Sequence, residues 1–265
     1  MRVVDCAGRA VIVTGGTRGI GAGIARGFLQ AGAHVLVCGR TEPADAALLP
    51  SANGRKAAFA RADVRDPEQA QRLVRAAVYL FGRVDVVVSN AGGSPYADAA
   101  TASPRFHAKI VELNLIAPLH IAQSANAVMQ DQPEGGSIIM IGSVSGTRPS
   151  PGTAAYGAAK AGLHHLATSL AVEWAPKVRV NSVVPGMVAT KSAAEHYGDA
   201  RGVAAAAGTV PLQRMATPDD VADACLFLAS PQAAYVSGAA LTLHGGGERP
   251  AFLAAVQAAV YAPKD

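Results

Sequence analysis

The sequence has few of the features that mark disulfide-stabilised or nucleic-acid-binding proteins. Its 265 residues include three cysteines, Cys6, Cys38 and Cys225, which are odd in number and widely spaced. They therefore predict free thiols in a reducing compartment. Only 5% of the residues are aromatic, and the net charge of +4 comes from scattered Lys and Arg residues without a basic run. Both observations disfavour binding to nucleic acid.

Long apolar runs and metal-binding spacings are missing as well. No stretch approaches the ~20 apolar residues that span a bilayer, and the few residues before a strand-like segment at Ala10 are too short for a signal peptide. We therefore expect a cytoplasmic protein. Among the seven histidines, His164 and His165 are adjacent, and no HxxxH spacing accompanies them, so no metal site is expected.

What the sequence does contain predicts an α/β fold. Half of the residues are hydrophobic and 16% are charged, which suits one domain, residues 1–265, with a large core. Apolar, β-branched runs predict seven strands at residues 10–14, 34–38, 57–62, 84–89, 138–141, 178–184 and 240–243. Helical stretches lie between most of them, at 19–31, 67–81, 104–129, 155–174 and 218–228, with a weaker one at 41–50. This alternation indicates a doubly wound parallel sheet with helices on both faces.

A glycine-rich turn directly follows the first predicted strand and opens the first helix. In this context the glycines allow a tight turn and a close approach to a pyrophosphate, which the helix N-terminus attracts. Past the second strand, where NAD-binding proteins place an acidic residue, the chain has Arg40 and Thr41. Together with Arg18 they suit a 2′-phosphate, so NADP is predicted over NAD. The residues of the turn are Gly15, Thr17, Arg18, Gly19, Ile20 and Gly21.

A second motif predicts proton transfer. Tyr156 and Lys160 lie four residues apart in a predicted helix, so the phenol and the ammonium share one face. A cation beside a phenol lowers the tyrosine pKa, as a general acid/base at neutral pH requires. Ser143, thirteen residues upstream, follows an apolar run and is expected to hydrogen-bond a substrate oxygen. Redox chemistry on an alcohol or a carbonyl is the reaction that these groups predict.

Taken in order, these motifs resemble those of the short-chain dehydrogenase/reductase family, in particular its 3-oxoacyl-acyl-carrier-protein reductases. The match covers residues 9 to 247. The resemblance implies a Rossmann-type sheet, a homotetramer or homodimer, and a catalytic tetrad of Asn114, Ser143, Tyr156 and Lys160. It also implies that the cofactor is bound by Tyr156 and Lys160 and by further residues along the chain, Asp63, Val64, Asn90, Gly92, Pro185, Gly186, Val188 and Thr190.

Two segments depart from the family's usual pattern or composition. Residues 190–215 include an Ala-rich stretch that is expected to be a mobile substrate lid, and residues 248–265 form an extension beyond the point where most members end. Its apolar residues recur at helical spacing and are expected to pack on a neighbouring subunit and to shape the substrate pocket. These apolar residues are Phe252, Leu253, Val256 and Val260.

The substrate is left open by the sequence. Candidate pocket residues combine small, polar and aromatic groups, which suit a 3-oxoacyl thioester, a sugar or polyol, or a cyclic ketone. A binding protein that senses the cofactor without catalysis is the alternative from another class, although an intact tetrad disfavours it. The candidate pocket residues are Gly93, Ser94, Pro95, Tyr96, Ser145, Met187, His196 and Tyr197.

Overall fold

A computed structural model describes residues 4–190, 197–248 and 250–261. At its centre is a sheet of seven parallel strands in the order β5-β2-β1-β6-β7-β8-β9. These strands are β1 (Ala10–Thr14), β2 (His34–Gly39), β5 (Ala58–Arg61), β6 (Val86–Ser89), β7 (Gly136–Ile141), β8 (Val178–Pro185) and β9 (Ala240–Leu243). The predicted parallel, doubly wound sheet is confirmed.

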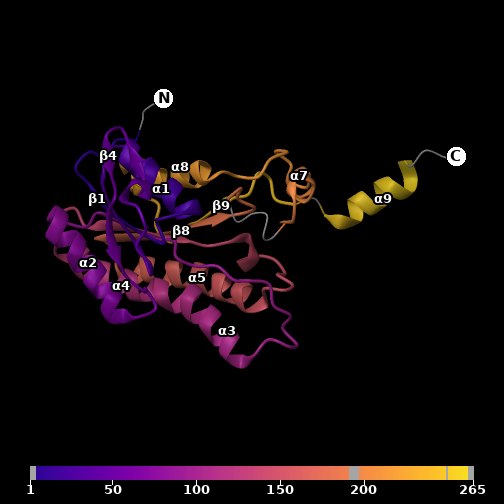
Figure 1. The fold of residues 1–265 in the computed structure, drawn as a ribbon, viewed down its shortest axis with the longest axis horizontal. Coiled ribbons are helices and arrows are strands. Elements are labelled where there is room, and N and C mark those ends of the chain that lie inside the picture. The colour runs from indigo at the N-terminus through magenta and orange to yellow at the C-terminus, as the bar shows by residue number, and fades with distance from the viewer. Residues whose placement is uncertain (1–3, 191–196, 249, 262–265) are drawn as a thin grey trace.

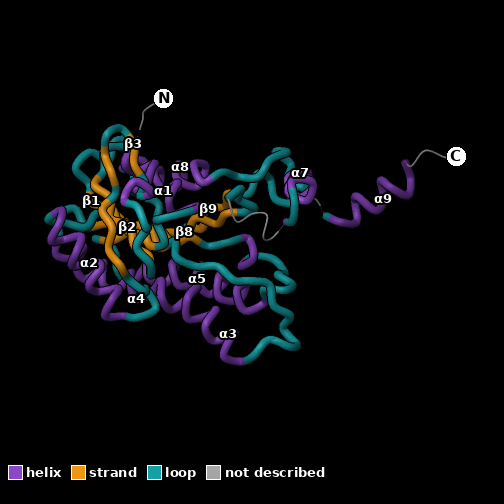
Figure 2. The backbone as a smooth tube through the Cα atoms, viewed as in Figure 1, coloured by secondary structure: helices purple, strands orange, loops and turns teal. Residues whose placement is uncertain are grey.

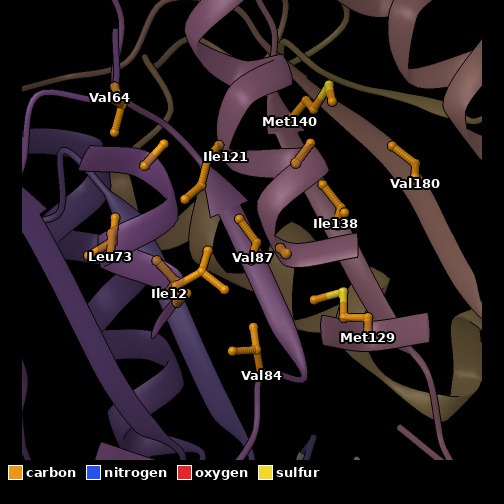
Figure 3. Close-up of a cluster of buried hydrophobic side chains, with 14 of the residues drawn as sticks. Ile12, Val64, Leu73, Val84, Val87, Ile121, Met129, Ile138, Met140 and Val180 are labelled. Atoms are coloured by element: carbon orange, nitrogen blue, oxygen red, sulfur yellow. The ribbon is translucent and has the colours of Figure 1, made fainter. Parts of the chain in front are cut away.

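Helices cover both faces of the sheet (Figure 1). One face packs against α1 (Gly19–Gln30) and α8 (Pro218–Ala229), and the other against α2 (Pro67–Phe81), α4 (Ala117–Asp131) and α5 (Ala154–Glu173). Strands β1, β6 and β7 are almost wholly buried, as expected for strands covered on both sides. Figure 3 shows part of the core on the second face, where Ile12, Val87 and Ile138 lie near Leu73 and Ile121.

The strand order fixes where a ligand would bind. The chain leaves β1 toward β2 on one side and later returns to β6 on the other, so the carboxyl ends of β1 and β6 form a switch point. In open parallel sheets, ligands bind in the crevice at such a point. The glycine-rich turn after β1 and the loop after β6 both lie there.

Three local features differ from the sequence prediction. The weak helix expected at residues 41–50 is only a short 3-10 turn, η1 (Ala46–Leu48), because Pro43 and Pro50 flank a segment with no buried residue in the turn. An unpredicted hairpin joins β3 (Ser51–Ala52) to β4 (Arg55–Lys56) through Asn53 and Gly54, both with positive φ. Asn-Gly is the preferred pair for such a turn.

The third difference lies in the helix expected at residues 104–129. It is divided into α3 (Pro104–Val111), a π-helical turn η2 (Glu112–Ile116) and α4. Shorter 3-10 turns, η3 (Val144–Gly146) and η4 (Pro231–Ala233), follow β7 and α8. Figure 2 shows how the loops between these elements gather on the side of the sheet that faces α7 (Ala200–Gly208).

The C-terminal helix α9 (Ala251–Tyr261) stands away from the rest of the protein (Figure 1). Its large apolar side chains Phe252, Leu253, Val256 and Val260 are all exposed. Helix α7 lies inside the segment expected to form a lid, whose residues 191–196 are outside the described part of the chain. Among the helices of the described residues, none combines the length and apolar character needed to cross a bilayer.

Candidate active site

The glycine-rich turn has the geometry of a phosphate cradle. Gly15 and Gly19 have φ angles of 62° and 54°, a region that favours glycine. A Cβ on Gly16 would lie 2.6 Å from a Val37 methyl group, and one on Gly21 would overlap the Gly15 carbonyl oxygen. No side chain in the described part of the protein caps the N-terminus of α1. Its amides, including that of Ile20, are therefore available to an anion, so the residues fit a dinucleotide pyrophosphate.

The turn lies directly against the end of β2. The Gly16 amide donates to the Cys38 carbonyl over 3.3 Å, and a Cβ on Gly39 would lie 3.7 Å from Thr17 Oγ1. Arg18 and Arg40 are both exposed at this junction. Within the described residues, neither guanidinium forms an ion pair or hydrogen bond, so both can turn toward a phosphate. Thr41 is exposed beside them.

Asn90 joins the glycine-rich turn to the loop after β6. Its amide nitrogen Nδ2 donates to the carbonyl oxygens of Thr14 and Gly15, at 2.9 and 3.3 Å. Its backbone N–H, like that of Ala91, donates to Thr14 Oγ1. Asn90, expected to line the cofactor cleft, thus also holds the two walls of that cleft together.

At the end of β5 the structure shows a partner for Asp63 that the sequence does not indicate. Arg65 forms an ion pair with Asp63 over 2.5 Å, and its hydrogen bonds lower the pKa of that carboxyl. The spacing of two residues gave no signal for this pair. The side chain of Val64 is buried in the core (Figure 3). Only its backbone therefore remains for contact with an adenine.

Helix α5 places Tyr156 and Lys160 one turn apart, with the ammonium 5.6 Å from the centre of the phenol ring. Lys160 is 3% exposed and donates to the Ile141 carbonyl at the end of β7 over 2.8 Å. Burial lowers the pKa of Lys160 to about 8. The ammonium is therefore largely charged at neutral pH, and it is held between helix and sheet.

The phenol differs from the sequence prediction in the direction of its pKa shift. Burial raises the pKa of Tyr156, against a hydrogen bond with Ser143 that lowers it. The sequence had predicted a lower pKa because of Lys160. In the structure that ammonium is directed at a backbone carbonyl, and burial of the phenol is the larger effect.

Ser143 follows β7 in extended backbone conformation, with φ at −166°. Its Oγ accepts a hydrogen bond from the Ser145 amide over 3.1 Å, which leaves its own hydroxyl hydrogen to donate. The hydrogen bond with the Tyr156 side chain shows that the two hydroxyl groups lie together. The structure thus brings Ser143, Tyr156 and Lys160 into one cluster.

Asn114 is fully buried in the π-helical turn η2. Its side chain donates to the carbonyls of Gly93 and Ile110 and accepts from the Gly93 amide, each over 2.9 Å. A Cβ on Gly92 would lie 2.7 Å from Asn114 Oδ1 and 3.3 Å from Lys160 Nζ. Asn114 therefore joins the cluster next to Gly92, where only glycine fits.

The loop after β8 approaches the same cleft. Pro185 ends β8, and the Gly186 amide donates to the Leu243 carbonyl. Val188 forms an isolated parallel bridge with Ala216. A Cβ on Gly19 would lie 3.8 Å from Thr190 Cγ2, so Thr190 reaches the glycine-rich turn.

The candidate substrate side is formed by several loops. In the loop of residues 93–97, Tyr96 lies against Gly152, and the Ala97 amide donates to the Gly152 carbonyl. Tyr197 is partly buried, and its electrostatic effect on the pKa of Tyr156 indicates proximity. Met187 lines a hollow of about 220 Å³ with His244 and Val210. His196 lies outside the described residues.

A larger hollow of about 470 Å³ lies beside the first turns of α5. Ser145 and Arg148 line it from the loop after β7, and Gly157 and Ala158 from the helix. Arg148 also forms an ion pair with Glu248 over 2.6 Å, joining this loop to the start of the C-terminal extension. Nothing in the sequence indicates this pair, because one hundred residues separate its members. Among the described residues, no group of three or more His, Cys, Asp or Glu side chains is arranged to hold a metal ion.

Comparisons with known proteins agree with this geometry. The family model described as Enoyl-(Acyl carrier protein) reductase matches residues 15–248. The chain is 37% identical to L-rhamnose 1-dehydrogenase (NAD(P)(+)) of Azotobacter vinelandii, over 90% of this chain and 96% of that protein. It is 34% identical to the 3-oxoacyl-[acyl-carrier-protein] reductase of Chlamydia muridarum, over 90% and 96%.

A solved structure, the RhlG/NADP active-site complex of Pseudomonas aeruginosa, matches with a TM-score of 0.84 and 31% identity, covering 93% of this chain and 98% of that one. The family model, the curated relatives and the solved structure of the complex each match most of the chain. The chain therefore belongs to the short-chain dehydrogenase/reductase family, whose members are oxidoreductases that bind a nicotinamide cofactor.

Proposed function

We propose that the protein is an NADP-dependent oxidoreductase that interconverts a carbonyl group and a secondary alcohol. The observation that carries the proposal is the cluster of Ser143, Tyr156, Lys160 and Asn114 beside the glycine-rich cleft. Bound NADPH would supply the hydride that adds to the carbonyl carbon. The chain's own residues would bind the cofactor, orient the substrate and move the proton.

Each member of the cluster has a distinct role in this proposal. Tyr156 gives its proton to the substrate oxygen in reduction and takes it back in oxidation. Ser143 orients that oxygen with its hydroxyl hydrogen. The Lys160 ammonium holds the cofactor ribose and stabilises phenolate when the proton has left. Asn114 holds the loop at Gly93 and a water that links Lys160 to solvent.

The cofactor is proposed to lie along the cleft from β2 to β8. The turn from Gly15 to Gly21 holds the pyrophosphate, and Arg18, Arg40 and Thr41 hold the 2′-phosphate. A guanidinium matches phosphate geometry, whereas an acid at residue 40 would repel it. Further along the cleft, the adenine and nicotinamide ends are contacted by Asp63, Val64, Asn90, Gly92, Pro185, Gly186, Val188 and Thr190.

For the substrate, we propose a sugar or polyol first and a 3-oxoacyl thioester second. The relatives named for L-rhamnose oxidation and for 3-oxoacyl reduction support these two classes. Residues 190–215 are proposed to close over the substrate as a lid. A panel of aldoses with NADP⁺, and of 3-oxoacyl thioesters and cyclic ketones with NADPH, followed by nicotinamide absorbance, tests the classes directly.

The proton-transfer role has a direct test. Tyr156→Phe removes only the hydroxyl group, so we expect kcat to fall by ~100-fold or more while NADPH affinity changes little. Stopped-flow kinetics and fluorescence titration of NADPH measure the two quantities. Tyr235→Phe, at a fully exposed position, is the matched control. Retained turnover in Tyr156→Phe would contradict the mechanism.

The cofactor preference has a separate test. Because charge-assisted hydrogen bonds contribute about 1.5–3 kcal/mol, Arg40→Ala should lower kcat/KM for NADPH about 10- to 100-fold and leave kcat/KM for NADH nearly unchanged. Arg75→Ala, an exposed arginine on α2, is the control. A parent enzyme that uses NADH as well as NADPH would overturn the preference without affecting the proton-transfer role.

A further inference from the structure

His164 lies one helical turn beyond Lys160 on α5, so Tyr156, Lys160 and His164 follow each other at intervals of four residues. The Ser143 amide donates a hydrogen bond to His164 Nε2 over 3.4 Å. One residue earlier, the Gly142 amide still pairs with the Val183 carbonyl of β8. The backbone leaves the sheet after Gly142, so the Ser143 amide has no partner on a neighbouring strand. His164 Nε2 accepts its hydrogen bond instead.

The loop is shaped to admit the imidazole ring. A Cβ on Gly142 would overlap His164 Nε2. One on Gly146 would lie 2.7 Å from the backbone nitrogen of Ala161 on α5 and 2.9 Å from His164 Cε1. Neither glycine has a φ in the left-handed region. Space for the ring, rather than backbone conformation, is therefore what requires glycine at Gly142, whereas at Gly146 the backbone of α5 comes closer than the ring.

The helix consequently holds the end of β7 at two points. Lys160 donates to the Ile141 carbonyl, and His164 accepts from the Ser143 amide. An imidazole nitrogen accepts a hydrogen bond only in the neutral ring. Burial, and the nearby positive charge of Lys160, lower the pKa of His164, which favours this neutral form.

We infer that His164 is a positioning residue for Ser143: its Nε2 fixes the Ser143 amide and thereby aims the hydroxyl at the substrate oxygen beside Tyr156. The inference rests on the proposed role of Ser143 in catalysis. Among the described residues, the Ser143 side chain accepts from the Ser145 amide in the adjacent turn and pairs with the Tyr156 hydroxyl, so the backbone at Ser143 decides whether that pairing is kept. A small rotation of the backbone at Ser143 would carry the hydroxyl away from the phenol.

Two variants separate the hydrogen bond from the bulk of the ring. His164→Gln keeps an acceptor oxygen, whereas His164→Met fills similar space without a strong acceptor. We expect kcat in His164→Met to fall about 10- to 100-fold, as for a misplaced catalytic group, with an unchanged dissociation constant for NADPH. His164→Gln should recover most of the loss. His165→Met, at the exposed neighbouring position, serves as the control.

A double-mutant cycle with Ser143→Ala decides whether the effect passes through the serine. If His164 acts only on the hydroxyl, His164→Met should cost nothing further once that hydroxyl is gone. An equal loss in both backgrounds, or a His164→Gln variant as slow as His164→Met, overturns the inference. If instead Ser143→Ala leaves kcat unchanged, the proposed function of Ser143 is what fails.

Discussion

At the scale of single residues, the ammonium of Lys160 is a buried charge at the cleft, and its burial changes its pKa. It is 3% exposed, and burial holds its pKa at about 8, below the ordinary value of 10.5. The folded protein therefore releases this proton at a lower pH than the unfolded chain does. Burial of this charge is costly, and we expect the protein to tolerate that cost because of the role proposed for the ammonium in binding the cofactor and stabilising phenolate.

This shift predicts how stability changes with pH. Between pH 8 and 10.5 the unfolded chain binds more protons at Lys160 than the folded protein, so the free energy of unfolding rises with pH. The gain is about 3 kcal/mol across the window and is lost as pH falls through 8. Urea unfolding at pH 7.5, 9 and 10.5 measures it against Lys160→Met.

In that comparison the lysines and tyrosines away from Lys160 are the same in both proteins, so the difference between the two curves reports the buried ammonium together with its effect on Tyr156. The difference should grow in favour of the parent protein as pH rises. Parallel curves would show that the ammonium is not destabilised by burial. Lys177→Met, at an exposed lysine, should give such parallel curves.

At the scale of elements, the π-helical turn η2 connects the long helical segment to the cleft. Inside it, Asn114 makes three hydrogen bonds, two of them with Gly93 in the loop after β6. A π turn places one more residue in the helix than α-geometry would, and such turns are frequent at functional sites. Asn114 lies in the chain between α3 and α4, and the extra residue lets its side chain reach Gly93 at the cleft.

Asn114→Ala tests the importance of these contacts. The substitution leaves the amide and carbonyl of Gly93 and the Ile110 carbonyl without their partner, so we expect a loss of about 2–4 kcal/mol in the free energy of unfolding. Asn126→Ala, which removes a single side-chain hydrogen bond on α4, should cost less than about 1 kcal/mol. Equal losses for the two variants would mean that the turn does not depend on Asn114.

The sequence predicts most of the elements because their signals are local. Continuous apolar runs marked the buried strands, and the predicted helix at 67–81 has the bounds of α2, with an Asp66 cap and Pro67 at its start. The π turn gave no such signal, since its register depends on bonds between Asn114 and the distant Gly93. Periodicity therefore predicted one unbroken helix.

The same limit applies to the candidate site. Tyr156 and Lys160 are recognisable because their spacing is that of one helical turn, and Gly15 and Gly19 because a turn follows a strand. His164 was visible only as one of two adjacent histidines. Its contact with Ser143 depends on how α5 packs against the end of β7, which no local pattern reveals.

At the scale of the whole molecule, helix α9 is the element whose stability is not accounted for by packing against the rest of the described chain. It has 11 residues, fewer than the ~12–15 that an isolated helix needs to be marginally stable in water. Four large apolar side chains on it are exposed, and no charged residue occurs between Ala251 and Tyr261. Such a helix gains stability when another surface covers its apolar side chains.

We propose that this surface belongs to another copy of the chain, in a homotetramer or homodimer. The Arg148–Glu248 ion pair joins the start of the extension to the loop after Ser143. We therefore expect a change of assembly to alter substrate binding as well. Removal of residues 248–265 should therefore lower the assembly mass in analytical ultracentrifugation and raise the KM for the carbonyl substrate.

Two further variants separate the two effects of that deletion. Val256→Ser removes one exposed apolar side chain of α9 but keeps the ion pair, so it should weaken assembly with little change in KM. Glu248→Gln removes the ion pair but keeps the helix, so it should raise KM without dissociating the oligomer. Tyr235→Ser, an exposed aromatic outside the extension, should change neither. If the deletion leaves both mass and KM unchanged, α9 has no role in assembly or in the pocket.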